Sequence, residues 1–237
     1  MFVKICGTTS EEDALLAVAM GAEALGFVFA PSARQMRPQD VADIVKRLPP
    51  EILTVGVFKD DLPERIVHIV RSTGLKGAQI HGSFSADDAV TVRRAIFHTF
   101  VAFAAADPRV EQAHSYEPYA LVLDGLRPGT GQTFDWTLSE RAPSDLKLIL
   151  AGGLTSDNVV EAIRTVRPWG VDVVSGVESS PGRKDPVKLR AFIAKAHAAG
   201  KELRDSAQMA RPEVRPPAPP QATPTTGAFY DWEADGL

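Results

Sequence analysis

Short apolar runs of strand length alternate eight times with longer segments of helical period over the first 200 residues. Runs that are apolar throughout, rather than at every second position, are typical of parallel strands buried on both faces. Eight strand-helix units with short connections and right-handed crossovers close most simply into a (βα)8 barrel, an α/β fold. An open, doubly wound sheet of eight strands is the alternative.

The order of the elements follows from these runs and from helix-capping residues. The predicted strands are residues 2–6, 24–29, 53–58, 77–81, 99–104, 119–124, 147–151 and 171–175. The predicted helices are residues 10–20, 39–48, 62–72, 85–96, 107–114, 156–166 and 186–199, with a weaker segment after Phe134. Thr9, Asp61, Ser85 and Asp185 are the residue types that cap helix N-termini, and each stands at a predicted start.

The barrel is expected to occupy residues 1–200, and the character of the chain changes after them. Residues 201–210 can extend the last helix, whereas residues 211–226 hold six prolines and read as an extended linker. The final residues combine Phe229, Tyr230 and Trp232 with acidic side chains. A disordered tail is the favoured interpretation, and a short docking motif that contacts this or another protein is the alternative.

Composition limits the kind of protein. With 44% hydrophobic and 24% charged residues and a net charge of −4, the chain is expected to be soluble and has no electrostatic attraction to nucleic acid. The single cysteine, Cys6, excludes an internal disulfide and a cysteine-based zinc site, which favours a reducing compartment. No apolar run approaches the roughly 20 residues of a membrane span, and the N-terminus does not read as a signal peptide. The expected location is the cytoplasm.

In a (βα)8 barrel, the residues at the carboxyl ends of the strands are the catalytic candidates. Cys6 lies at such an end and shares a strand face with Lys4. A lone cysteine is often only a small buried hydrophobe, so its position carries the functional interpretation. The other candidates at strand ends are Phe29, Arg34, Arg37, Asp60, Gln79, His81, Asp124, Gly152, Gly153, Ser175 and Gly176.

Two glycine-bearing loops point to a phosphate. Gly152-Gly153 follows the seventh predicted strand, and Ser175-Gly176 follows the eighth. Backbone N–H groups from these adjacent loops can converge on one anion, as they do in barrels that act on phosphorylated substrates. The alternative is that the glycines only turn the chain.

Seven motifs, in order and at barrel spacing, resemble the phosphoribosylanthranilate isomerase family over residues 2 to about 198. They are Lys4-Ile5-Cys6-Gly7, Gly26-Phe27-Val28-Phe29, Val55-Gly56-Val57-Phe58, Gln79-Ile80-His81-Gly82, Gly129-Thr130-Gly131-Gln132-Thr133-Phe134-Asp135-Trp136, Ala151-Gly152-Gly153-Leu154 and Val171-Asp172-Val173-Val174-Ser175-Gly176-Val177-Glu178. The resemblance implies a (βα)8 barrel that performs an Amadori rearrangement in tryptophan biosynthesis. Its substrate is N-(5-phosphoribosyl)anthranilate, its product is 1-(2-carboxyphenylamino)-1-deoxyribulose 5-phosphate, and it uses no metal or organic cofactor.

The resemblance also implies roles for individual residues. It makes Cys6 the general base, Asp124 the general acid and Arg34 the contact for the anthranilate carboxylate. The full set of substrate-binding residues that we expect is Arg34, Gln79, His81, Gly152, Gly153, Asp172, Ser175 and Gly176. Arg37 is a rival to Arg34, and a structural hydrogen-bonding role is the alternative for His81. The loop around Arg34 and the stretch after Asp124 both read shorter than is usual in the family, which puts specificity in question more than reaction type.

The chemistry requires shifted pKa values. A free aspartic acid titrates near 3.9 and a free thiol near 8.5, so we expect burial to raise the pKa of Asp124 and a nearby cation to lower that of Cys6. Barrel closure would also bring Asp172 beside Lys4, and we predict a buried ion pair between them, because a buried charge is tolerated only when it is paired. The alternative is that Lys4 reaches outward to solvent.

Two other functions remain open at this point. The same barrel and phosphate site could act on another sugar phosphate. The chain could also be a binding module recruited through its tail, although Cys6 and Asp124 are both present.

Overall fold

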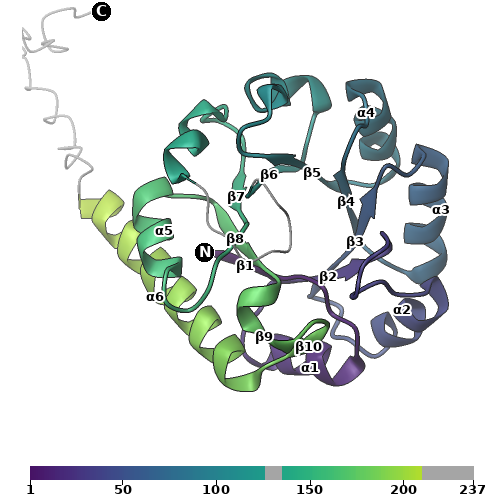
Figure 1. The fold of residues 1–237 in the computed structure, drawn as a ribbon, viewed down its shortest axis with the longest axis horizontal. Coiled ribbons are helices and arrows are strands. Elements are labelled where there is room, and N and C mark those ends of the chain that lie inside the picture. The colour runs from purple at the N-terminus through teal and green to yellow at the C-terminus, as the bar shows by residue number, and fades with distance from the viewer. Residues whose placement is uncertain (126–134, 210–237) are drawn as a thin grey trace, which may run out of the picture.

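The computed structural model describes residues 1–125 and 135–209 of the chain. Within them, eight parallel strands close into a barrel in sequence order, with β1 paired to β8 (Figure 1). The predicted (βα)8 barrel is therefore confirmed, and the open sheet is wrong. The Thr130-Gly131 turn, most of the compact stretch after Asp124, and the Pro-rich and aromatic segments after residue 210 lie outside the described residues.

All eight predicted strands are present. They are β1 Phe2–Ile5, β2 Ala24–Val28, β3 Leu53–Lys59, β4 Gly77–His81, β5 His98–Ala104, β6 Ala120–Asp124, β7 Leu148–Leu150 and β8 Gly170–Val173. In β6, residues 120–123 are all buried, because one face meets the barrel interior and the other meets the surrounding helices. This two-sided burial explains why the strands are mostly apolar along their whole length in the sequence.

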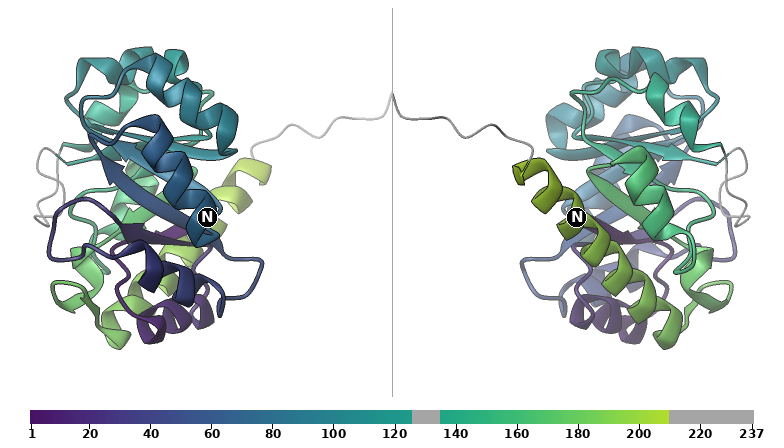
Figure 2. Two further views of the ribbon diagram at one scale, coloured as in Figure 1. Left: turned by 90° about the vertical axis from the view of Figure 1, so that its right-hand side faces the viewer. Right: turned by 90° about the vertical axis from the view of Figure 1, so that its left-hand side faces the viewer.

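Helices surround the barrel, as Figure 1 shows. They are α1 Glu11–Ala19, α2 Pro38–Val45, α3 Pro63–Thr73, α4 Ala86–Ala95, the 3-10 helices η1 Pro108–Tyr116 and η2 Trp136–Arg141, α5 Val159–Val166 and α6 Pro186–Met209. Figure 2 shows α6 running diagonally across the flank of the barrel, where it packs on α5 and α1. The weak segment predicted after Phe134 is the short helix η2.

Two of the predicted helix starts are correct and two are wrong. Ser85 forms a capping box with Asp88, and Asp185 accepts hydrogen bonds from backbone N–H groups in the first turn of α6. The helix α1 is capped by Ser10 rather than Thr9, whose hydroxyl donates instead to the carbonyl oxygen of Gly182. The helix α3 begins at Pro63 without a side-chain cap, so Asp61 does not cap it.

A short insertion after β8 was not predicted. It consists of the 3-10 turn η3 Ser175–Val177 and a hairpin of β9 Glu178–Ser180 and β10 Arg183–Lys184. The hairpin lies beside α1 at the carboxyl ends of β1 and β8 (Figure 1). It therefore brings additional side chains to the mouth of the barrel.

Candidate active site

Cys6 directly follows β1 at the barrel mouth. Its backbone N–H donates to the carbonyl oxygen of Val173 at 2.9 Å, and its side chain is 4% exposed. On the neighbouring strand, Gly26 leaves room for the thiol, because a Cβ atom built there would lie 2.6 Å from Sγ. The sequence thus places a buried thiol among strand ends, where the glycine of β2 accommodates it.

Below Cys6, a buried ion pair spans the seam between the first and last strands. Lys4 and Asp172 are partners in the β1–β8 register, and Nζ of Lys4 lies 3.0 Å from Oδ1 of Asp172. The two side chains are 0% and 5% exposed. Burial disfavours the ammonium, but the charge of Asp172 and that of the Cys6 thiolate, when it forms, outweigh burial and raise the pKa of Lys4. The predicted pair is confirmed, and the outward orientation of Lys4 is wrong.

Asp124 ends β6, and its environment suits a proton donor. Burial raises the pKa of its carboxyl to about 6, against the opposing effect of a hydrogen bond from the N–H of Gly125. That bond is 2.7 Å long. The charge of Asp172 adds to the rise and that of Lys4 reduces it. The predicted direction for Asp124 is therefore confirmed, and the carboxyl can hold or release a proton near neutral pH.

The pKa of Cys6 moves in the direction opposite to our prediction. Burial raises it, and this effect outweighs the nearby ammonium groups of Lys4 and Lys184, which both lower it. The cations that we expected near the thiol are present, but burial destabilises the thiolate more than these cations stabilise it. The resting thiol is therefore neutral, and thiolate forms only as a minor species near neutral pH.

The two predicted phosphate loops come together. Gly152, Gly153, Ser175 and Gly176 line one small pocket, which Asp124 and Asp172 complete. A side chain at Gly176 would place Cβ 1.9 Å from the carbonyl oxygen of Leu154, so glycine lets the two loops approach each other. The pocket is a concave surface of backbone at the carboxyl ends of β7 and β8, the place where barrels hold phosphate.

A residue that the sequence analysis did not select holds one of these loops. Asn158 donates from Nδ2 to the carbonyl oxygen of Gly153 at 2.9 Å and accepts from the N–H of Thr155 at 2.8 Å. These two bonds fix the loop between β7 and α5.

Gln79 and His81 lie next to each other on β4 and are joined by a hydrogen bond between Nε2 atoms. Burial, together with the charges of Lys4 and Lys59, lowers the pKa of His81 to about 4. The ring is therefore neutral at pH 7, and its Nε2 can accept from the amide of Gln79. His81 also lines a pocket of about 490 Å3 with Phe58 and Phe103, so it has both a structural partner and access to the mouth.

Asp60, another strand-end candidate, has a structural role. Its carboxylate accepts a hydrogen bond of 2.7 Å from the N–H of Ser83 and so braces the turn after β4.

Arg34 is held in place by an acidic partner. Its Nε lies 2.8 Å from Oε1 of Glu178, and its Nη2 lies 2.7 Å from Oε2. The stem of Arg34 passes over Gly7, where a Cβ atom would lie 2.6 Å from Cδ of the arginine. Arg37, the rival, pairs with Asp40 and has an 83% exposed side chain. The structure thus brings Arg34, and not Arg37, next to Cys6.

The sequence analysis assigned no role to two charged residues of the hairpin: Glu178, which ends one of the quoted motifs, and Lys184. The Nζ atom of Lys184 donates to the carbonyl oxygen of Cys6 at 2.6 Å and lies 3.2 Å from Oε1 of Glu178. Burial lowers the pKa of this lysine despite the opposing charge of Glu178. Strands of two or three residues give no periodic pattern, so nothing in the sequence signalled that these residues are buried.

Among residues 1–125 and 135–209, no group of three or more His, Cys, Asp and Glu residues could hold a metal ion. In the same part of the chain, no helix has both the length and the apolar character that crossing a membrane requires.

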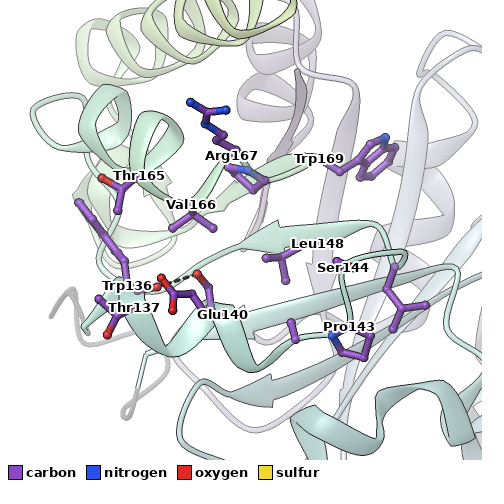
Figure 3. Close-up of a pocket in the computed structure, with 14 residues that line it drawn as sticks. Trp136, Thr137, Glu140, Pro143, Ser144, Leu148, Thr165, Val166, Arg167 and Trp169 are labelled. Atoms are coloured by element: carbon purple, nitrogen blue, oxygen red, sulfur yellow. Dashed lines mark hydrogen bonds between the residues drawn. The ribbon is translucent and has the colours of Figure 1, made fainter. Parts of the chain in front are cut away.

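A hollow of about 620 Å3 lies away from the strand ends, on the flank between η2 and α5. Figure 3 shows Trp136 and Trp169 at opposite ends of it, with Val166 and Leu148 between them in this view. None of the residues that line it is a candidate site residue, and we assign it no part in the chemistry.

Comparison with known proteins identifies one family. Residues 3–195 match the family model described as PRAI, N-(5'phosphoribosyl)anthranilate (PRA) isomerase. An N-(5'-phosphoribosyl)anthranilate isomerase from Desulforudis audaxviator is 46% identical over 195 residues, which are 81% of this chain and 95% of that protein. Another from Thermotoga petrophila is 40% identical and covers 82% of this chain and 97% of its own length.

Solved structures agree with the sequence comparisons. The phosphoribosyl anthranilate isomerase of Thermus thermophilus superposes with a TM-score of 0.79 at 40% identity, covering 84% of this chain and 99% of that one. A second structure of such an isomerase was solved in complex with reduced 1-(o-carboxyphenylamino)-1-deoxyribulose 5-phosphate. It has a TM-score of 0.74 at 38% identity and covers 84% of this chain and 99% of that one.

Proposed function

The chain belongs to the N-(5'-phosphoribosyl)anthranilate isomerase family and isomerises N-(5'-phosphoribosyl)anthranilate, and we propose that Asp124 and Cys6 are the general acid and base. The reaction belongs to tryptophan biosynthesis and yields 1-(2-carboxyphenylamino)-1-deoxyribulose 5-phosphate. One observation carries the assignment: both side chains lie within electrostatic reach of the same buried pair, Lys4 and Asp172, at the barrel mouth.

The first step is ring opening. Asp124 gives its proton to the furanose ring oxygen while the C1–O bond breaks, and the nitrogen lone pair forms the C=N bond of a Schiff base. A carboxyl with a pKa of about 6 is protonated in a useful fraction of molecules near neutral pH, unlike an exposed aspartic acid.

The second step is proton removal at C2. The thiolate of Cys6 takes this proton, the electrons move toward the nitrogen, and the resulting enolamine tautomerises to the ketone. Although the thiol is neutral at rest, Lys4 and Lys184 stabilise the thiolate when it forms. Because the pKa of the thiol is high, only a small fraction of molecules carry the thiolate. Each thiolate is nevertheless a strong base, which suits the removal of a carbon-bound proton.

The two ends of the substrate have separate candidate sites. We assign the phosphate to the backbone of Gly152, Gly153, Ser175 and Gly176, and the anthranilate carboxylate to Arg34. Gln79 and His81 project from β4, and Asp172 pairs with Lys4 below Cys6.

Oxidation of Cys6 would remove the proposed base, and the chain has no second cysteine to replace it. Oxidation would therefore abolish the reaction. We therefore also propose that the protein works in a reducing compartment, the cytoplasm.

The experiment is the turnover of phosphoribosylanthranilate, followed by the loss of substrate fluorescence. Robust activity of the intact chain that falls by factors of about a hundred or more in Cys6→Ser and in Asp124→Asn supports the acid and base assignment. Full activity in either variant would remove that residue from the mechanism.

A further inference from the structure

Glu178, at the start of β9, is a buried carboxylate that uses both of its oxygens. Oε2 accepts from Nη2 of Arg34, while Oε1 accepts from Nε of Arg34, from Nζ of Lys184 at 3.2 Å and from the N–H of Gly182 at 3.3 Å. The side chain is 4% exposed. Burial would raise the pKa of Glu178, but the bonds from Arg34 and the charge of Lys184 lower it, so it is ionised. A carboxylate this well bonded is a fixed part of the site.

The bond to Glu178 uses one edge of the Arg34 guanidinium. A guanidinium has five N–H donors in a plane and can hold one carboxylate along its Nε/Nη2 edge and another along its Nη1/Nη2 edge. Glu178 occupies the first edge, and Nη1 has no hydrogen-bond partner within residues 1–125 and 135–209. The arrangement leaves the second edge available for a ligand.

The location of that edge is set by the residues around it. The stem of Arg34 is packed against Gly7, the residue after Cys6, and the Cys6 thiolate, when it forms, attracts the guanidinium. Lys184 ties the hairpin to the carbonyl oxygen of Cys6. The base, the arginine and Glu178 are thereby joined into one unit at the rim of the barrel.

We propose that Glu178 is a positioning residue for recognition of the anthranilate carboxylate: by holding one edge of Arg34, it presents the other edge to the substrate. This inference rests on the role assigned to Arg34 under the proposed function. A long arginine side chain loses rotamer freedom when it binds a ligand, and Glu178 has already removed much of that freedom.

The proposal predicts which kinetic constant changes. The anthranilate carboxylate keeps its charge throughout the rearrangement, so its contact with Arg34 is equally strong in the ground state and in the transition state. Loss of a contact of this kind raises KM and leaves kcat almost unchanged. A change in Cys6 or Asp124 would instead lower kcat.

The test uses Glu178→Gln and two ligands. Gln keeps the shape and can still offer Oε1 to Lys184, Gly182 and Nε of Arg34, but its NH2 group opposes Nη2 of Arg34. The ligands are the reduced product analogue 1-(2-carboxyphenylamino)-1-deoxyribitol 5-phosphate and the same compound without the carboxyl group. Affinities are measured by calorimetry for the full chain and for Glu178→Gln, Arg34→Ala and Glu202→Gln. The last is the matched control, because it breaks an Arg–Glu contact on the outside of α6.

We expect Glu178→Gln to bind the carboxylated analogue about tenfold more weakly and the carboxyl-free analogue within about twofold of the full chain, with KM raised and kcat kept. Arg34→Ala should show the same selectivity with a larger loss, and Glu202→Gln should show none. Equal losses for both ligands in Glu178→Gln, or no loss, would overturn the inference. If Arg34→Ala itself fails to distinguish the ligands, the assigned role of Arg34 is wrong as well.

A second variant covers the case in which Glu178→Gln does not fold. Arg34→Lys leaves Glu178 and Lys184 paired and keeps the positive charge, but an ammonium has no pair of parallel edges. It should lose about tenfold in affinity for the carboxylated analogue only. Unchanged affinity would overturn the two-edge arrangement.

Discussion

Lys4 and Asp172 are separated by 168 positions in the sequence and by 3.0 Å between Nζ and Oδ1 in the structure. The pair joins β1 to β8 at the seam of the barrel, below the proposed catalytic groups. Its charges act on Cys6 and on Asp124. One contact therefore contributes to both the fold and the chemistry.

Lys4→Met should destabilise the protein by about 3–5 kcal/mol, because it leaves the buried carboxylate of Asp172 without a partner. The free energy of unfolding in urea measures this loss. Adding Asp172→Asn should recover part of it, since no buried charge then remains. If the loss in the free energy of unfolding of the double variant equals the sum of the losses of the two single variants, the residues do not interact.

The pH dependence of kcat/KM follows from the two pKa shifts. The proposed mechanism requires protonated Asp124 and ionised Cys6. As the pH rises toward 6, Asp124 stays protonated and thiolate increases, so kcat/KM rises. Between that value and the raised pKa of Cys6, the fall in protonated Asp124 cancels the rise in thiolate, and the profile is flat. Above the thiol pKa, kcat/KM falls.

Asp124→Asn tests this assignment. Without a carboxyl that titrates, the residual kcat/KM should follow thiolate alone and rise about tenfold per pH unit through the range in which the intact chain is flat. If the kcat/KM profile of Asp124→Asn still changes from rising to flat near pH 6, that change in slope belongs to the titration of another group.

Gly26→Ala should lower both stability and activity, because the new Cβ would lie 2.6 Å from Sγ of Cys6. Overpacking of this kind costs roughly 1–3 kcal/mol. The measurement is the free energy of unfolding of Gly26→Ala with Cys6 present and in a Cys6→Ala background. The cost should be smaller when the sulfur is gone, and an equal cost in both backgrounds would mean that the glycine serves the strand rather than the thiol.

Deletion of residues 211–237 should leave kcat and KM within about twofold, since Cys6, Asp124 and the phosphate loops all lie among residues 1–209. Steady-state kinetics of the shortened and full chains make the comparison. A large loss of turnover would show that the segment contributes to the site. Loss of association with another protein, at full turnover, would support the docking interpretation of Phe229, Tyr230 and Trp232.

The parts of the fold that sequence reasoning predicted are those governed by repeating physical patterns. Burial on both faces makes the barrel strands mostly apolar, with only single polar residues such as Lys4, Gln79 and Asp172 within them, so all eight could be located. Strand pleat and barrel closure were enough to predict the ion pair between Lys4 and Asp172 that the structure shows. The roles of Cys6 and Asp124 came instead from the family resemblance, since a lone cysteine and an aspartate have no specific pattern.

The parts that could not be predicted depend on tertiary contacts. The pKa of Cys6 is a balance between burial and two cations, and only the structure shows that burial is larger. Glu178 and Lys184 are buried by a hairpin too short to leave a periodic signal. The cap at Ser10 was missed for a related reason, because the hydroxyl of Thr9 is engaged by Gly182.

Barrel closure at the β1–β8 seam has a consequence for synthesis on the ribosome. The partner of Lys4 is made 168 residues later, so at about 5–20 residues per second β1 waits for roughly 10 to 30 s with one edge unpaired. An unpaired strand edge is a template for pairing with other chains, and an inward lysine is one of the charges that discourage it. Until Asp172 emerges, the charge of Lys4 therefore disfavours pairing of the open edge of β1 with other nascent chains.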